Sequence, residues 1–161
     1  MMSAVQDILL NFFCAFFGTI GFAVMFNVPK RFYISCGTTG AMGWIVYCLA
    51  VEHASAAVSS FFGALVVVLI SRMLTVRLKC PITIFMISGI FPLVPGAGVY
   101  YTAYYLVTGQ LGEAAQRGIG AVKVAFAIVL GIVFIVSIPR EFFQPLYWKK
   151  RWKLRKASKE A

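Results

Sequence analysis

Two prolines and two glycines interrupt an otherwise apolar stretch, "GIFPLVPGAGVYYTAYYLV", at residues 89–107. Pro92 and Pro95 have no backbone N–H, and Gly96 and Gly98 disfavour a helix interior. The sequence therefore predicts a broken helix. A helix that restarts after such a break has amide groups without carbonyl partners and carries the positive end of the helix dipole. Exposed amides of this kind favour a carboxylate, so residues 92–98 are the first candidate binding site.

Tyrosines follow the break directly. Tyr100 and Tyr104 share one helical face with Thr108, and Tyr101 and Tyr105 lie beside them. A tyrosine in an apolar interior needs a hydrogen-bond partner for its hydroxyl group, so Tyr100 and Tyr104 are predicted to line a polar pathway. The alternative is a proline-kinked packing helix whose tyrosines belong to the aromatic belt of a membrane surface.

Three further polar or basic residues fall inside apolar blocks. Thr38 lies in "CGTTGAMGW" (36–44), where glycines three residues apart favour close helix packing, with a contribution to a cavity as the alternative. Arg72 and Lys123 each have two interpretations. Their side chains either reach the membrane surface or contact a substrate or a partner's acidic group.

Other kinds of chemistry have little support. No Asp or Glu lies deep within an apolar block, His53 is the sole histidine, and the four cysteines form no CxxC pair. The sequence contains no nucleotide-binding loop and no metal-ligand cluster. We therefore predict that the protein is not an enzyme and that it uses no cofactor or metal.

The composition indicates how these residues are positioned. The chain has 161 residues, of which 61% are hydrophobic and 12% charged, and its apolar residues form blocks of about the 20 residues that a membrane-spanning helix needs. We predict an all-α integral membrane protein with one domain, 1–161, and no soluble domain. The expected spans are 8–28, which is retained and not cleaved as a signal peptide, 32–51, 54–76, 82–108 and 118–138. The break lies about 16 Å along the fourth span, near the middle of the bilayer.

Basic residues predict the orientation. Thirteen Lys and Arg residues fall on the side of the first loop, the third loop and the C-terminus, against two on the other side. Because cytoplasmic loops carry the excess of Lys and Arg, we expect the N-terminus outside and the C-terminus in the cytoplasm. The tail, 139–161, mixes aromatic and basic residues and is expected to bind anionic lipids, with docking of a cytoplasmic partner as the alternative. This placement of the net charge of +10 argues against nucleic acid as a partner.

Three segments occur in an order that resembles the small subunit of the bacterial threonine/serine exporter family. They are "GFAVMFNVPKR" (21–31), "FPLVPGAGVYYTAYYLV" (91–107) and "SIP" (137–139) followed by the aromatic and basic tail. The proline–glycine break is the most specific of these elements, and "FNVP" is the second. The resemblance covers nearly the whole chain. It marks motif positions at Asn27, Pro29, Pro92, Pro95, Gly96, Gly98 and Tyr100, and it assigns no individual roles to them.

The resemblance also implies a function and a partner. In the split form of this family, a five-span small subunit pairs with a larger subunit that has five further spans and a soluble cytoplasmic domain. Such a pair would export threonine and serine, or a dicarboxylate such as succinate, across a bacterial inner membrane. Two rival interpretations remain. One is a non-transporting assembly subunit, and the other is a channel formed by self-association of this chain.

Overall fold

The computed structural model describes residues 2–139, and these form helices and turns without a strand. The prediction of a lipid-binding tail concerns residues 139–161, which lie outside the described part of the chain apart from Pro139. The elements are α1 (Met2–Met25), the 3-10 helix η1 (Lys30–Phe32), α2 (Tyr33–Val51), α3 (Ala56–Leu78), α4 (Thr83–Ile90), the 3-10 helix η2 (Phe91–Leu93), α5 (Gly96–Val107) and α6 (Leu111–Val136).

Five membrane spans can be formed from the described helices. Four segments, at 6–25, 30–51, 56–78 and 111–136, are long and apolar enough to cross a bilayer. The fifth is the pair 83–93 and 96–107, which is bent by 51°. The prediction of an all-α protein with a broken fourth span is therefore confirmed. The last helix begins at Leu111, earlier than the predicted 118, because the polar residues before the apolar block also favour a helix.

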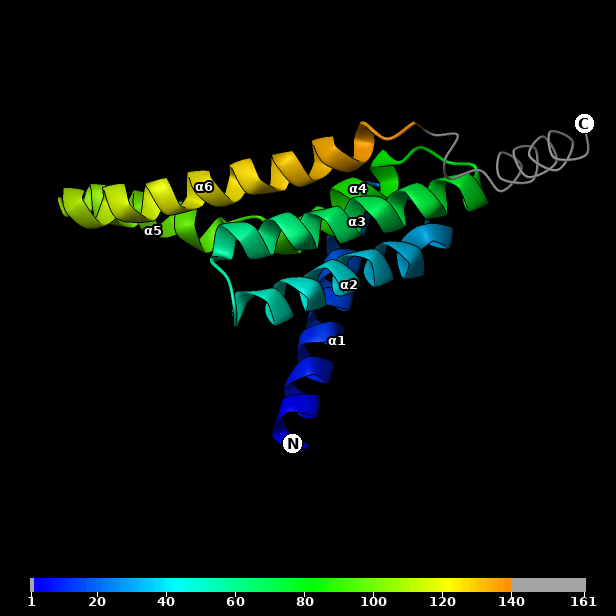
Figure 1. Ribbon diagram of the computed structural model, residues 1–161, viewed down its shortest axis with the longest axis horizontal. Coiled ribbons are helices and arrows are strands. Elements are labelled where there is room, and N and C mark those ends of the chain that lie inside the picture. Colours follow the sequence, from blue (N-terminus) through cyan, green and yellow to red (C-terminus); the bar gives the residue numbers. More distant parts are fainter. Residues whose placement is uncertain (1, 140–161) are drawn as a thin grey trace, which may run out of the picture.

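The helices are unequally covered by one another. Contacts join α3 to both α2 and α6, so α3 occupies the middle of the bundle. Figure 1 shows α1 crossing the other helices steeply, with its N-terminal half extending away from them. The hairpin of α5 and α6 extends past the turn between α2 and α3 (Figure 1), and no residue of α5 is buried. The core that positions the break is thus formed by α1, α2, α3, α4 and α6.

Glycines allow the helices of this core to approach closely. A Cβ atom at Gly40 would overlap the Thr19 side chain of α1, and one at Gly43 would overlap the Val67 side chain of α3. A Cβ atom at Gly131 in α6 would lie 2.9 Å from the Phe61 carbonyl oxygen. Small residues at these crossings bring the helix backbones into contact. The packing interpretation of the glycines in α2 is confirmed.

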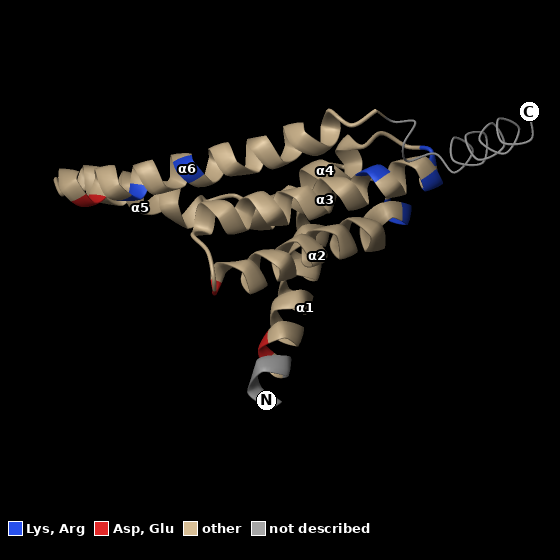
Figure 2. Cartoon of the chain, viewed as in Figure 1, with Lys and Arg blue, Asp and Glu red and all other residues tan. Residues whose placement is uncertain are grey.

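Charged residues separate along the bundle. Figure 2 shows the basic residues of the first and third loops at one end, and the acidic residues of the α2–α3 turn and of α6 toward the other. The two basic residues of α6, Arg117 and Lys123, also lie in this second half of the bundle. Arg72 of α3 belongs to the basic end but is only 8% exposed. Its guanidinium group donates a hydrogen bond of 2.6 Å to the Val136 carbonyl oxygen at the end of α6. Arg72 therefore caps a helix C-terminus, where a cation is favoured.

Candidate functional site

The break consists of a short extended step between two helices. The η2 turn ends at Leu93, and Val94 has φ −62° and ψ 132°, outside the helical region. The Val94 amide bonds to the Phe91 carbonyl oxygen at 3.1 Å, and the Gly96 amide bonds to the Val94 carbonyl oxygen at 2.7 Å. The first helical bond of α5 runs from the Val99 amide to the Pro95 carbonyl oxygen at 3.1 Å. The amides of Ala97 and Gly98 precede that bond and so lack a helical acceptor.

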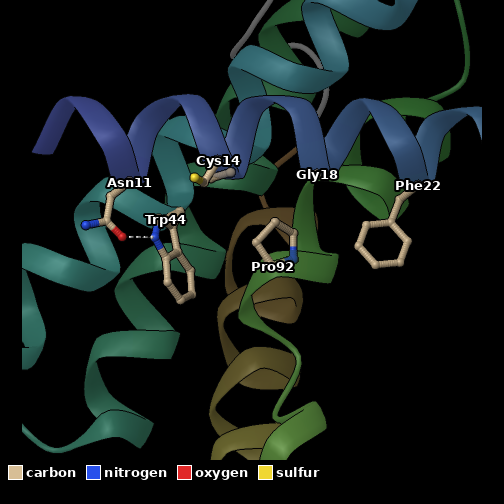
Figure 3. Close-up of a pocket in the computed structure, with 7 residues that line it drawn as sticks. Asn11, Cys14, Gly18, Phe22, Trp44 and Pro92 are labelled. Atoms are coloured by element: carbon tan, nitrogen blue, oxygen red, sulfur yellow. Dashed lines mark hydrogen bonds between the residues drawn. The ribbon is translucent and has the colours of Figure 1, made fainter. Parts of the chain in front are cut away.

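An open pocket of about 290 Å³ lies beside the break, where α1 crosses α2, and two of its lining residues, Cys14 and Gly18, are exposed. We call this pocket the central cavity. Figure 3 shows the Pro92 ring on one side of it, with the side chains of α1 opposite. Trp44 of α2 closes a further side. The residues that line the cavity are Asn11, Cys14, Ala15, Gly18, Phe22, Trp44 and Pro92. The break therefore forms part of a pocket wall, and the pocket has the size of a small-metabolite site.

Asn11 provides the fixed polar group of this cavity. Its Oδ1 atom accepts a hydrogen bond of 3.1 Å from the Trp44 indole Nε1, as Figure 3 shows. Its Nδ2 atom donates to the Asp7 carbonyl oxygen at 2.9 Å. The Trp44 ring also stacks on Tyr47, with centroids 5.1 Å apart. These contacts fix the amide and the indole in place. The Asn11 amide keeps one Nδ2 hydrogen and further acceptor capacity at Oδ1 for a small ligand, and the Trp44 ring forms part of the apolar wall.

The cavity lies near the middle of the bundle. Trp44 follows the start of α2 by about 17 Å of helix rise and precedes its end by about 11 Å. Pro92 lines the same cavity and therefore lies at a similar depth along α2. A break at this depth agrees with the position expected from the sequence, about 16 Å along the fourth span.

A second, smaller cavity of about 180 Å³ continues from Asn11 along the α1–α2 crossing. Asp7 of α1 and Glu52 at the end of α2 both line it, together with Cys48. Because Asn11 lines both cavities, it lies between the central cavity and the acidic end of the bundle. The crossing of α1 and α2 thus holds a series of hollows leading from the break toward one end. Among the described residues, no group of three or more His, Cys, Asp or Glu is placed to hold a metal ion.

The structure brings only part of the predicted site together. Pro92 lines the central cavity, whereas Gly98 lines a separate groove between α5 and α6. A Cβ atom at Gly96 would meet nothing within 4 Å. Tyr100 and Tyr104 are 65% and 50% exposed, and neither lines these cavities. The break therefore separates the predicted residues into an inward-facing wall and an outward-facing helix.

The other predicted residues make local contacts. Asn27 has φ 56° and ends α1. The following amide, of Val28, bonds to the Ala23 carbonyl oxygen, and the Asn27 amide bonds to that of Val24, both at 3.0 Å. This pattern is a left-handed helix cap, a conformation that asparagine tolerates. The Thr38 hydroxyl group donates to the Ser35 carbonyl oxygen at 3.0 Å within α2. Lys123 is exposed on α6.

Sequence reasoning did not identify Asn11 and Trp44 as site residues. A signal was present, because Asn11 is an amide inside an apolar block and Trp44 has a polar N–H. Their meeting depends on the angle at which α1 crosses α2, and no sequence pattern gives that angle.

Comparison with known proteins identifies a family that covers most of the chain. The family model described as "Threonine/Serine exporter, ThrE" matches residues 11–138, which include every residue that lines the central cavity. No curated protein matches the chain, and no solved structure matches it.

Proposed function

Because the chain belongs to the threonine/serine exporter family, we propose that it exports a small carboxylate-bearing metabolite from the cytoplasm. The protein is a multi-pass membrane transporter of the threonine/serine exporter type. Candidate substrates are threonine, serine, or a dicarboxylate such as succinate. The observation that carries the proposal is the cavity of about 290 Å³ at the broken span, because irregular backbone at membrane depth is tolerated where it is buried in protein or lines a wet cavity.

The proposed path follows the crossing of α1 and α2. The substrate occupies the cavity beside Pro92, where Asn11 and Trp44 orient it, and it leaves past Cys48 toward the acidic end of the bundle. Broken helices at the middle of a membrane are a recurring feature of transporter binding sites. The excess of Lys and Arg at the opposite end supports a cytoplasmic location for that end, in a bacterial inner membrane, with the N-terminus outside.

We further propose that the chain acts with a second subunit that contains five more spans and a soluble cytoplasmic domain. The support is the uncovered state of α5. With Tyr100 65% exposed and Tyr104 50% exposed, these tyrosines line a pathway only if another chain covers them. Their hydroxyl groups, in a membrane, would otherwise lack hydrogen-bond partners.

An efflux assay tests this function. Cells preloaded with labelled serine, threonine or succinate would express this chain alone, the larger family subunit alone, or both. We expect saturable efflux only with both chains. Full efflux with the larger subunit alone would assign this chain an assembly role, and non-saturating conductance with this chain alone would indicate a channel.

A further inference from the structure

A groove between α5 and α6 has a chemistry of its own. Its volume is about 430 Å³. Gly98 of α5 lines it together with small residues of α6, and Gln116 and Arg117 supply its polar groups. The lining residues are Gly98, Gln116, Arg117, Gly120, Ala121 and Val124. A Cβ atom at Gly98 would lie 3.2 Å from that of Ala121, so the two helices nearly touch at the floor. A ligand there can approach the backbone closely.

Arg117 is held by an aromatic ring. Its guanidinium carbon lies 5.9 Å from the centroid of the Tyr101 ring, and within residues 2–139 it forms no ion pair. Tyr101 in turn stacks on Tyr105, with centroids 6.3 Å apart. A cation over a ring keeps its charge and its planar set of N–H donors available for a carboxylate, which an arginine binds with two parallel hydrogen bonds.

The charges around the groove leave it positive. α5 contains no charged residue, and neither does the first half of α3, which packs on α6. On α6 itself, Glu113 lies one turn before Arg117 and Lys123 follows at the edge of the same face. Within α5 and α6, the charged groups in and next to the groove are thus two basic and one acidic. A single carboxylate would balance them.

The groove lies toward the end of the bundle opposite the basic cluster. In α6, Gly131 packs against residues 61–65 of α3. The two helices run in the same direction (Figure 1). Ala121 lies ten residues, or about 15 Å of helix rise, before Gly131. It is therefore level with the turn between α2 and α3, which precedes the start of α3. That turn carries Glu52, and it is the end toward which the proposed path leads.

We propose that this groove binds the carboxylate of a small organic acid, with Arg117 as its charged partner and Gln116 as an amide donor. The identification of that acid with the exported metabolite rests on the proposed function, and the binding itself does not. The broken segment connects the central cavity and this groove. Pro92 lines the cavity, and Gly98, in the first turn of α5, lines the groove. The groove then provides a carboxylate site toward the same end of the bundle as the proposed path, between α5 and α6 and apart from the α1–α2 crossing.

Cysteine protection measures this binding without transport. The four native cysteines are replaced by alanine, and Gly120→Cys is introduced, because a Cβ atom there meets nothing within 4 Å. Unsealed membranes containing this chain and its proposed partner are labelled with N-ethylmaleimide, in the presence of serine, succinate or uncharged glycerol. Gly112→Cys is the matched control, because it is also on α6, also has open space and does not line the groove.

We expect serine or succinate, but not glycerol, to slow labelling at position 120 several-fold, with no effect at position 112. Arg117→Gln should raise the concentration needed for half protection by roughly tenfold or more, and Arg117→Lys by less. An unchanged labelling rate without ligand shows that the variants fold. Equal effects of glycerol and carboxylates, or protection that survives Arg117→Gln, would overturn the proposal. If substrate is exported but carboxylates do not protect position 120, the groove proposal fails and the exporter proposal stands. If carboxylates protect position 120 but no substrate is exported, the exporter proposal fails and the groove proposal stands.

Discussion

Replacing Gly18 by leucine tests the central cavity most directly. Gly18 lines the cavity from α1, and a Cβ atom there would meet nothing within 4 Å. The new side chain therefore enters the hollow without displacing a neighbouring helix. Leucine also favours a helix over glycine by about 1 kcal/mol, so the substitution should not weaken α1.

The expected effect follows from volume. A leucine side chain adds four heavy atoms, each comparable to a water molecule with its share of about 30 Å³, so it removes about 120 Å³. The cavity holds about 290 Å³. Threonine, with its eight heavy atoms, needs about 240 Å³ on the same scale, so the narrowed pocket holds it less completely. We expect the rate of efflux to fall at least about tenfold, which corresponds to about 1.4 kcal/mol.

The assay is efflux of labelled substrate from cells expressing both proposed subunits, normalised to the amount of this chain in the membrane. Gly21→Leu is the matched control, because Gly21 is also on α1 with open space around its Cβ position and does not line the cavity. It should leave efflux within about twofold of the unmodified protein, since exposed substitutions of this kind change stability by only about 0.5 kcal/mol. Unchanged efflux in Gly18→Leu, at normal membrane abundance, would show that the cavity is not on the transport path.

Three other substitutions separate packing from function. Gly40→Val should lower membrane abundance, because its side chain overlaps Thr19 and overpacking costs about 1–3 kcal/mol. Immunoblots of membranes measure this, with Gly96→Val as the control, and equal amounts of the two variants would contradict the close crossing of α1 and α2. Arg72→Met should lower the temperature of aggregation in detergent, because the hydrogen bond to Val136 is charge-assisted and contributes about 1.5–3 kcal/mol; an unchanged temperature would refute the capping role. Gly96→Leu should abolish efflux at normal abundance, since its Cβ position is open and a side chain there shields the first amides of α5; loss of the protein from the membrane would instead favour a packing kink.

Local chemistry made the break predictable from the sequence. Pro92 and Pro95 remove backbone donors, and this property acts whatever surrounds them. The spans followed from the length of the apolar blocks in the same way. The helix α6 begins at Leu111, before the span expected at 118–138, because hydropathy marks the part of a helix that suits lipid and not where its hydrogen bonds begin.

The central cavity depends on tertiary geometry and was therefore not predictable. Asn11 and Trp44 are 33 residues apart, and they meet only because Gly40 lets α1 approach α2 closely. The glycines of α2 did predict close packing, but they gave no angle. Asn27 is a motif position whose local role can be read from the backbone. The structure shows that it provides the left-handed cap of α1, and its place in the site stays a prediction.

The uncovered surface of α5 supports the proposal that this chain acts with a second subunit. Tyr100, Tyr101 and Tyr104 lie on a helix with no buried residue, and among the described residues no tyrosine hydroxyl group forms a hydrogen bond with a side chain. Lipid tails would leave these hydroxyl groups unsatisfied, whereas a polar face on another helix would satisfy them. The same helix begins at the break and lines the Arg117 groove. A second subunit that packs on α5 would therefore cover the tyrosines and enclose the groove at the same time. The proposed partner and the proposed carboxylate site thus involve the same helix.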